Sequence, residues 1–120
     1  MTKQHFGQAS VPLSPAVRAG DFIFVSGQVP TADGAVAPGG IEAQTRQVLD
    51  NVAAALALAG AALSDVVKTT VVLTDARDFA AFNAVYASYF PSNPPARTTL
   101  EAKLMIDITV EIEAVAYRPL

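Results

Sequence analysis

The apolar residues of this chain change their spacing repeatedly along the sequence, and this alternation constrains the fold more than any other feature. A spacing of two residues is typical of a strand, whereas spacings of three and four residues are typical of a helix. Strand spacing marks 22–25, 67–73, 98–104 and 108–115, and helical spacing marks 41–59 and 78–90. The resulting order of strands, helix, strand, helix and strands predicts an α+β fold, with the helices covering one face of a mixed sheet.

Each predicted helix has one face of large apolar side chains. On the first helix this face consists of Val48, Leu49, Val52, Leu56 and Ala59. Gly60 follows directly and is a natural residue to end that helix. The second helix carries an aromatic stripe, most simply read as core packing, that consists of Phe79, Phe82, Tyr86 and Phe90. Pro91 then prevents this helix from continuing.

The predicted strands have one face for the core and a second face of mixed character. In the last strand, Val110 and Ile112 point one way while Glu111 and Glu113 point the other. The same alternation in 67–73 places four side chains on one face of the strand: Val67, Thr69, Val71 and Leu73. On the second sheet face we expect Thr, Glu and Arg among Val and Leu. This face is too apolar for open water and too polar for a core, which predicts a subunit interface with pockets.

Composition supports an assembly of small subunits and argues against two classes of partner. With 120 residues the chain predicts a single domain, 1–120, and 52% hydrophobic residues are many for a small surface to accommodate. We therefore expect an oligomer. A net charge of −3, with Lys and Arg scattered singly, argues against a nucleic-acid partner. No apolar run is long enough to span a membrane, and the first ten residues lack an apolar signal core, so we expect a cytoplasmic protein.

The residue types that most enzymes use for nucleophilic or metal chemistry are scarce here. The chain has no cysteine, so it forms no disulfide, thiolate nucleophile or cysteine-ligated metal site. Its one histidine, His5, lies in a segment that we expect to be a mobile tail. No phosphate-binding loop, dinucleotide fingerprint or metal-ligand spacing is present, which predicts no cofactor and no metal. Any catalysis must use carboxylates, hydroxyls, backbone groups, arginine and water.

Arg97 is the first candidate for a functional residue, because it follows a proline-rich loop at the start of a half-buried strand. A guanidinium offers a planar, permanently charged fork that matches a carboxylate ligand. The structural alternative is an ion pair with Glu101, Glu111 or Glu113 that braces the sheet. Residue type alone favours that structural alternative.

Four other side chains or groups are candidates, and each has a simpler structural explanation. Glu111 and Glu113 are about 6–7 Å apart on one strand face, where one can polarise a water molecule or both can simply be solvated. Ser26-Gly27 breaks a predicted strand, so its backbone N–H groups can approach a ligand or merely form a turn. Asn83 points its amide either into a cleft or to the helix surface.

Taken together, several blocks of the sequence resemble the Rid family, also called YjgF-type proteins or reactive intermediate deaminases. The blocks occur in the family's order, between about Val17 and Arg118, and read FVSGQVP, QTRQVLDNVAAAL, DVVKTTVVLTDARDFAAFNAVYASYF, PPARTTLEAKL and VEIEAVAYR. The resemblance implies a chorismate-mutase-like α+β fold, a homotrimer and a cleft at each subunit interface. It also implies a role for Arg97 in binding ligands, in place of the structural one.

The activity that this resemblance implies is the hydrolysis of 2-imino or 2-enamino acids to 2-oxo acids and ammonia. By the same resemblance, Arg97 grips the substrate carboxylate and Glu111 positions the attacking water. Residues that match the family's cleft are Ser26, Gly27, Asn83 and Thr99. No cofactor is implied, because an imine is electrophilic enough to be hydrolysed by an oriented water.

The sequence departs from the family at a few positions that matter for this activity. Ala16 stands where many active members have an aromatic residue, usually tyrosine, and Thr99 stands where cysteine is common. Met105 occupies a loop position that is usually proline. The missing aromatic leaves open the alternative of a non-catalytic trimer that binds or senses small carboxylates. A ribonuclease activity, also attributed to the family, conflicts with the acidic charge.

Overall fold

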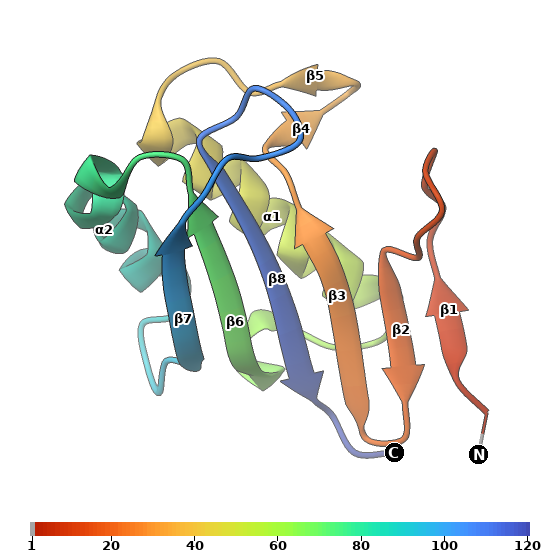
Figure 1. Cartoon of the computed structure of the whole chain (residues 1–120). Helices are drawn as coiled ribbons and strands as arrows, with labels where there is room; N and C mark the ends of the chain where they lie inside the picture. Colours follow the sequence, from red (N-terminus) through yellow and green to blue (C-terminus); the bar gives the residue numbers. More distant parts are fainter. Residues whose placement is uncertain (1) are drawn as a thin grey trace.

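The computed structural model describes residues 2–120, and in this part of the chain two α-helices cover one face of the main β-sheet (Figure 1). The helices are α1 (Ile41–Leu58) and α2 (Phe79–Tyr89). The strands are β1 (Gln4–Phe6), β2 (Ala16–Ala19), β3 (Phe22–Gln28), β6 (Val66–Leu73), β7 (Ala96–Glu101) and β8 (Val110–Tyr117). They lie in the order β1-β2-β3-β8-β6-β7, antiparallel except for the parallel pair β6 and β7. The predicted α+β class and the placement of the helices are therefore confirmed.

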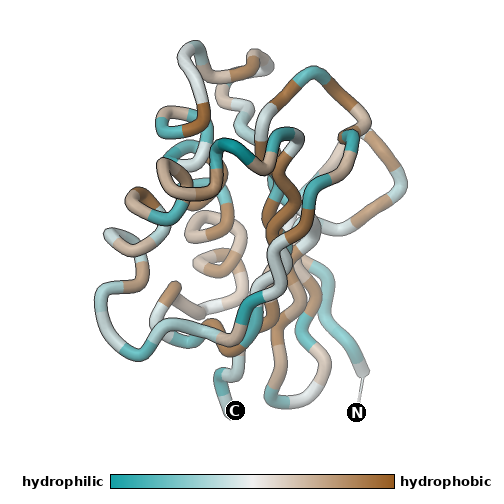
Figure 2. Tube along the Cα trace, turned by 60° about the vertical axis from the view of Figure 1, so that its left-hand side comes forward, coloured by the Kyte–Doolittle hydropathy of each residue, from teal (hydrophilic) through white to brown (hydrophobic). Residues whose placement is uncertain are grey.

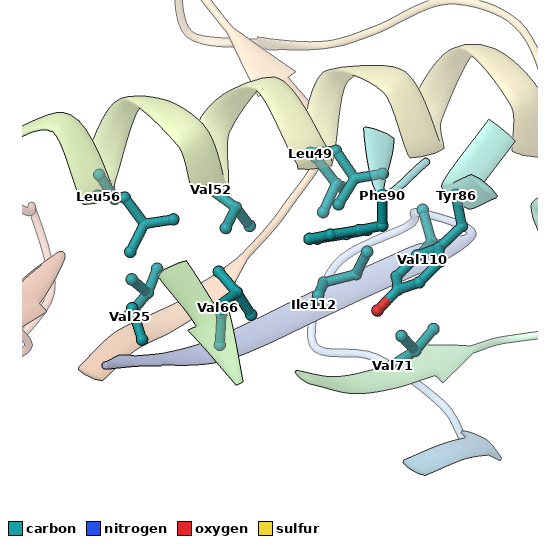
Figure 3. Close-up of a cluster of buried hydrophobic side chains, with 14 of the residues drawn as sticks. Val25, Leu49, Val52, Leu56, Val66, Val71, Tyr86, Phe90, Val110 and Ile112 are labelled. Atoms are coloured by element: carbon teal, nitrogen blue, oxygen red, sulfur yellow. The ribbon is translucent and has the colours of Figure 1, made fainter. Parts of the chain in front are cut away.

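The core lies between α1 and the middle strands of the sheet. Leu49, Val52 and Leu56 of α1 are fully buried and face Val25 of β3 and Ile112 of β8 (Figure 3). Each such side chain contributes roughly 1.5–3 kcal/mol by leaving water. The predicted helical spacing thus corresponds to the buried face of α1. The helix ends at Leu58, and Gly60, two residues later, has a φ of 79°.

Two strand predictions were wrong in detail. Val67 was expected to share a face with Thr69, Val71 and Leu73, which are buried, but it is 44% exposed. The cause is an extra residue in β6: Val66 pairs with Ala116, and Lys68 already pairs with Val115. Such a bulge reverses the facing of the residues before it. The strand expected to reach Leu104 ends at Glu101, since β6 ends at Leu73 and offers no further partner after the Ala102 N–H bond to the Leu73 carbonyl.

Two segments that looked irregular are paired strands. His5 lies in β1, opposite Val17 of β2, and its Nδ1 is 2.8 Å from the Ser14 hydroxyl, so the expected mobile tail is an edge strand. The loop after β3 contains a small hairpin, β4 (Thr31–Ala32) and β5 (Ala35–Val36). Its turn residues have φ of 54° at Asp33 and 80° at Gly34, the positive values that a tight two-residue hairpin turn requires.

The face of the sheet opposite the helices, called the open face below, exposes large apolar side chains. Because Ile23 and Val25 point into the core, the alternate residues Phe22 and Phe24 point away from the helices. They are 42% and 47% exposed, and Phe22 stacks at 5.3 Å on Tyr117, its partner on β8. Figure 2 shows α1 and α2 on the same side of the strands. No element of residues 2–120 packs over these aromatic rings.

The start of β8 is fixed by a buried glutamine of α1. Gln44 is 7% exposed, and its Oε1 accepts hydrogen bonds from the Thr109 N–H at 2.8 Å and from the Thr109 hydroxyl at 2.7 Å. The Gln44 amide in turn donates to the Ala37 carbonyl at 3.4 Å. This residue thereby joins α1 to both loops at the upper end of the sheet in Figure 1.

We predict that Gln44→Ala lowers the free energy of unfolding by about 1–3 kcal/mol, because two donors of Thr109 lose their acceptor. The measurement is urea denaturation at fixed protein concentration. Gln47→Ala, in the next turn of α1, is the control, since Gln47 is half-buried and bonds only to Asn51 within residues 2–120. Equal losses for both variants would show that Gln44 does not fix β8.

Candidate functional site

Arg97 lies on the helix-covered side of the sheet, under α2. In the parallel pairing of β6 and β7 it stands beside Thr69, whose side chain faces the core and hydrogen-bonds the Tyr86 hydroxyl at 2.7 Å. Neighbouring residues in such a pair point the same way. Our expectation of an arginine on the second sheet face was therefore wrong. The parallel register, which the sequence pattern does not reveal, decides the side.

The guanidinium of Arg97 rests on aromatic rings. Its Cζ lies 4.8 Å from the ring centroid of Tyr86, 5.4 Å from that of Phe82 and 5.7 Å from that of Phe79. We call these three rings the aromatic cradle. Cation–π contacts of this kind are worth about 0.5–2 kcal/mol each. Phe79, expected in the core, is 46% exposed and serves as the outer wall of the cradle.

The polar edge of this guanidinium has no partner among residues 2–120. Within residues 2–120 no carboxylate is close enough to Arg97 for an ion pair, and no hydrogen bond joins it to another residue. The structural alternative, an ion pair with Glu101, Glu111 or Glu113, is therefore not what the fold builds. Glu101 instead accepts a hydrogen bond from the Ala76 N–H at 2.7 Å.

Arg97 lines a cleft of about 530 Å³ at the edge of the sheet. The other lining residues come from α2 and the proline-rich loop: Asn83, Tyr86, Ala87, Phe90, Pro94 and Pro95. The Oδ1 atom of Asn83 is buried without a hydrogen-bond partner in the described chain. An unpaired buried acceptor is costly and is uncommon away from functional sites. Arg97 and Asn83, both predicted from the sequence, thus share one cleft.

Thr99 belongs to a second, smaller pocket on the same side of the sheet. It lies two residues beyond Arg97 on β7 and therefore points the same way. Its pocket of about 250 Å³ is called the side pocket below, and its lining consists of Leu73, Ala76, Phe79, Thr99, Leu100 and Glu101. Phe79 belongs both to this lining and to the aromatic cradle, so the side pocket adjoins Arg97.

Glu111 lies on the opposite side of the sheet, on the open face. Its neighbours in β8, Val110 and Ile112, are fully buried beneath the helices, so Glu111 points away from them. Its carboxyl group packs against Gly27, where an added Cβ would lie 3.1 Å from Glu111 Cδ and closer still to Oε2. Glycine at position 27 therefore makes the space that this carboxylate occupies.

Gly27 is placed by a β-bulge that the sequence pattern had suggested was a strand end. Val25 pairs with Ala114 and Gln28 with Ile112, so that Ser26 and Gly27 together lie opposite one residue of β8. The strand continues through the bulge to Gln28. The Ser26 hydroxyl donates to the Ser14 carbonyl at 2.6 Å, which leaves its oxygen free to accept. Bulges of this kind are common beside functional sites because they redirect side chains.

The carboxyl group of Glu111 has an unusual electrostatic environment. Burial raises its pKa above the ordinary glutamate value, and the neighbouring charge of Glu113 raises it further. In the described chain no lysine or arginine forms an ion pair with it. A carboxylate whose pKa is raised is a stronger base than an exposed glutamate, which suits a general base.

The predicted residues therefore form two half-sites on opposite faces of one sheet. The helix-side half contains Arg97, Asn83 and Thr99, and the open-face half contains Ser26, Gly27 and Glu111. One copy of the chain cannot bring the two halves together. Our sequence reasoning missed the aromatic cradle, although the stripe that forms it was visible, because an aromatic stripe on a helix normally indicates core packing.

Two further observations concern the described residues as a whole. Residues 2–120 contain no group of three or more His, Asp or Glu side chains placed to hold a metal ion. In the same part of the chain, no helix combines the length and the apolar character that crossing a bilayer requires.

Comparison with known proteins gives consistent matches over nearly the whole chain. Residues 3–118 match the family model described as endoribonuclease L-PSP. A RutC family protein of Pyrococcus horikoshii is 48% identical over 110 residues, which cover 89% of this chain and 87% of that protein. The 2-iminobutanoate/2-iminopropanoate deaminase of Escherichia coli is 43% identical over 113 residues, covering 89% and 88%.

Solved structures agree with these sequence matches. Yeast Mmf1 superimposes with a TM-score of 0.94 at 33% identity, covering 98% of this chain and 99% of that chain. The YjgF gene product of E. coli gives a TM-score of 0.87 at 42% identity, covering 92% and 91%. The resemblance predicted from the sequence blocks is therefore confirmed, and the chain belongs to the endoribonuclease L-PSP family, which is the Rid or YjgF family.

Proposed function

We propose that this protein hydrolyses reactive 2-imino and 2-enamino acids to 2-oxo acids and ammonia, in a cleft formed between two copies of the chain. The observation that carries the proposal is the guanidinium of Arg97, which is held by the aromatic cradle and has an unpaired polar edge. A carboxylate ligand fits that edge bidentately. The E. coli relative named as a 2-iminobutanoate/2-iminopropanoate deaminase supports the same reaction.

In this proposal the helix-side half-site binds the substrate. The carboxylate accepts hydrogen bonds from the in-plane N–H groups of Arg97, which the contacts with the aromatic cradle leave free. The amide of Asn83 lies in the same cleft and can hydrogen-bond the reacting nitrogen or the carboxylate. Fixing both ends of a small molecule lowers the entropic part of the barrier, which is the main gain available without a nucleophile.

The open-face half-site of a second copy supplies the base. The 2-imino acid reacts as the protonated iminium, and an enamino acid reaches that form by taking a proton at its terminal carbon. Glu111 accepts a proton from water while the water oxygen bonds to the iminium carbon. The same carboxyl group then returns the proton to the nitrogen. As the carbon–nitrogen bond breaks, the hydroxyl oxygen becomes the carbonyl of the 2-oxo acid, and its proton passes through the regenerated Glu111 carboxylate to the departing ammonia, which leaves as ammonium. The open-face residues Ser26 and Gly27 border the path of the water.

We further propose that the assembly is a homotrimer with the chorismate-mutase-like arrangement of the family. The aromatic rings on the open face support this, because water-exposed groups such as Phe22 and Phe24 favour burial against another copy. Association through this face brings Glu111 of one copy towards another copy. Each cleft of such a trimer contains Arg97 from one chain and Glu111 from the next.

We predict that Arg97→Ala and Glu111→Gln each abolish ammonia release from freshly generated 2-iminopropanoate, and that mixing the two variants restores part of it. A shared site needs an intact Arg97 on one chain and an intact Glu111 on its neighbour. In randomly mixed trimers about one quarter of the sites meet that condition. The measurement is ammonia release after the variants are unfolded together and refolded as a mixture.

The control for this experiment mixes Arg97→Ala with Arg97→Lys and should restore nothing beyond the residual activity of the second variant. Activity of Arg97→Ala equal to wild type would refute the assigned role of Arg97. Full loss of activity in the mixture of Arg97→Ala and Glu111→Gln, with trimers intact by light scattering, would show that the two residues do not work across an interface.

The raised pKa of Glu111 gives a prediction for pH dependence. Because the base is active as a carboxylate, kcat/KM rises with pH through the pKa of Glu111, above the range of an exposed glutamate. Glu113→Gln removes one of the two causes of the shift, so the rise should move to lower pH. The pH of this rise should still lie above the ordinary glutamate range, since the burial of Glu111 remains. Glu42→Gln, an exposed change in the first turn of α1, should leave the profile unmoved.

A second candidate function is a non-catalytic protein that binds small carboxylates. It is favoured by Ala16, which takes the place of the family's usual aromatic residue and is fully buried in β2, so it lines no cleft. Calorimetry distinguishes the two functions. Binding of pyruvate that is lost in Arg97→Ala, together with no turnover of any imine, would favour the binding protein over the enzyme.

We do not include nucleic acid among the proposed partners, although the name of the matched family contains a ribonuclease. The chain carries a net charge of −3, with 8 Lys and Arg residues against 11 Asp and Glu residues. Binding to phosphates depends on clustered positive charge. Arg97 itself is recessed against the aromatic cradle, where a small anion has better access than a polynucleotide.

A further inference from the structure

The side pocket next to Arg97 has no role in the reaction as proposed above. Its walls are mostly apolar, apart from Thr99 and Glu101, and Leu73 in its lining is 2% exposed. It lies at the C-terminal ends of β6 and β7, beneath the first turn of α2. A space of about 250 Å³ is several times that of one water molecule. It is therefore large enough for a branched aliphatic group.

The side pocket lies directly beside the position that the carboxylate of a bound substrate would occupy at Arg97. Phe79 contacts the guanidinium, with its ring centroid 5.7 Å from Cζ, and also lines the pocket. Thr99 points the same way as Arg97 from two residues further along β7, a distance of roughly 6–7 Å. In a 2-imino acid the side chain starts one carbon beyond the carboxylate. A chain of about three to five carbons held at Arg97 can therefore enter the pocket.

The carboxylate of Glu101 makes this pocket favour neutral ligand groups over negatively charged ones. Its Oε2 is held at the rim by the Ala76 N–H at 2.7 Å. Within the described chain no lysine or arginine forms an ion pair with Glu101. A second carboxylate on the ligand would be repelled there, whereas a neutral side chain would lose only its contact with water.

We infer that the side pocket is the subsite for the side chain of the substrate, and that this protein prefers 2-imino acids with neutral aliphatic side chains of about three to five carbons over those with a methyl or an acidic side chain. The identity of the reacting group rests on the proposed function. The preference itself concerns binding, and it applies equally to the stable 2-oxo acids.

Calorimetric binding of 2-oxo acids to the wild-type protein is the first test, because these compounds do not decay. From pyruvate to 2-oxobutanoate to 4-methyl-2-oxopentanoate, affinity should rise about fourfold for each added carbon. The acidic 2-oxoglutarate should bind at least about tenfold more weakly than 4-methyl-2-oxopentanoate. Glu101→Gln, which can still accept from the Ala76 N–H, should raise the affinity for 2-oxoglutarate.

Filling the pocket is the second test. Ala76 is exposed at the mouth, so Ala76→Leu places a side chain in the pocket without disturbing the core. It should weaken binding of 4-methyl-2-oxopentanoate at least about tenfold and leave pyruvate within about twofold. Ala80→Leu, an exposed change on α2 outside both pockets, is the matched control and should affect neither ligand.

The outcomes separate this inference from the proposed function. Equal affinities along the series, or equal weakening of both ligands by Ala76→Leu, overturn the subsite even if imines are hydrolysed. The expected preference in binding, without hydrolysis of any imine, supports the subsite and contradicts the enzyme. If no 2-oxo acid binds to the wild-type protein, the subsite is overturned, and the proposed enzyme is then decided by ammonia release from imines alone.

Discussion

The candidate site depends on how Arg97 is held. A guanidinium has two flat faces and a polar edge, and an ion pair with the protein would use that edge. Here the aromatic cradle of Phe79, Phe82 and Tyr86 supports the group without using any N–H donor. Tyr86 is itself fixed by the buried hydrogen bond to Thr69, and burial raises its pKa, so it stays neutral. The cation is thereby rigid and still able to bind an anion.

The sheet explains why the remaining chemistry is on the other side. Alternation along β8 places the core residues Val110 and Ile112 on one side and Glu111 on the other. A sheet separates the two half-sites in every single copy, whatever the rotamers of the side chains. The apolar open face, on which Phe22 and Tyr117 are exposed, favours association on the side where Glu111 lies. In our proposal, assembly and completion of the site are therefore the same event.

The sequence predicted the features that depend on the spacing of residues within one helix or strand. It missed the features that depend on how neighbouring strands pair. The buried face of α1 follows from residues three and four apart, and Gly60 ends it as expected. The bulges at Val67 and at Ser26–Gly27 add one residue against a partner strand, which spacing within a single strand cannot reveal. The side of Arg97 was wrong for a related reason, because its register with Thr69 is set across the sheet. The residues of both half-sites came from the family resemblance, since each had a simpler structural explanation by itself.

Several unfavourable features of the described chain lie at these two half-sites or on the open face beside Glu111. Glu111 is partly buried without an ion-pair partner in the described chain, and Asn83 has a buried oxygen with no donor. Aromatic rings on the open face remain in water. A protein of marginal stability keeps such costs where function needs them and compensates elsewhere, here through the packing of α1 on the sheet. A second copy on the open face would bury the rings, and a ligand at Arg97 would supply a partner for the cation and, through its nitrogen, a donor for Asn83. The same contacts that stabilise the protein would then be the ones that build the site.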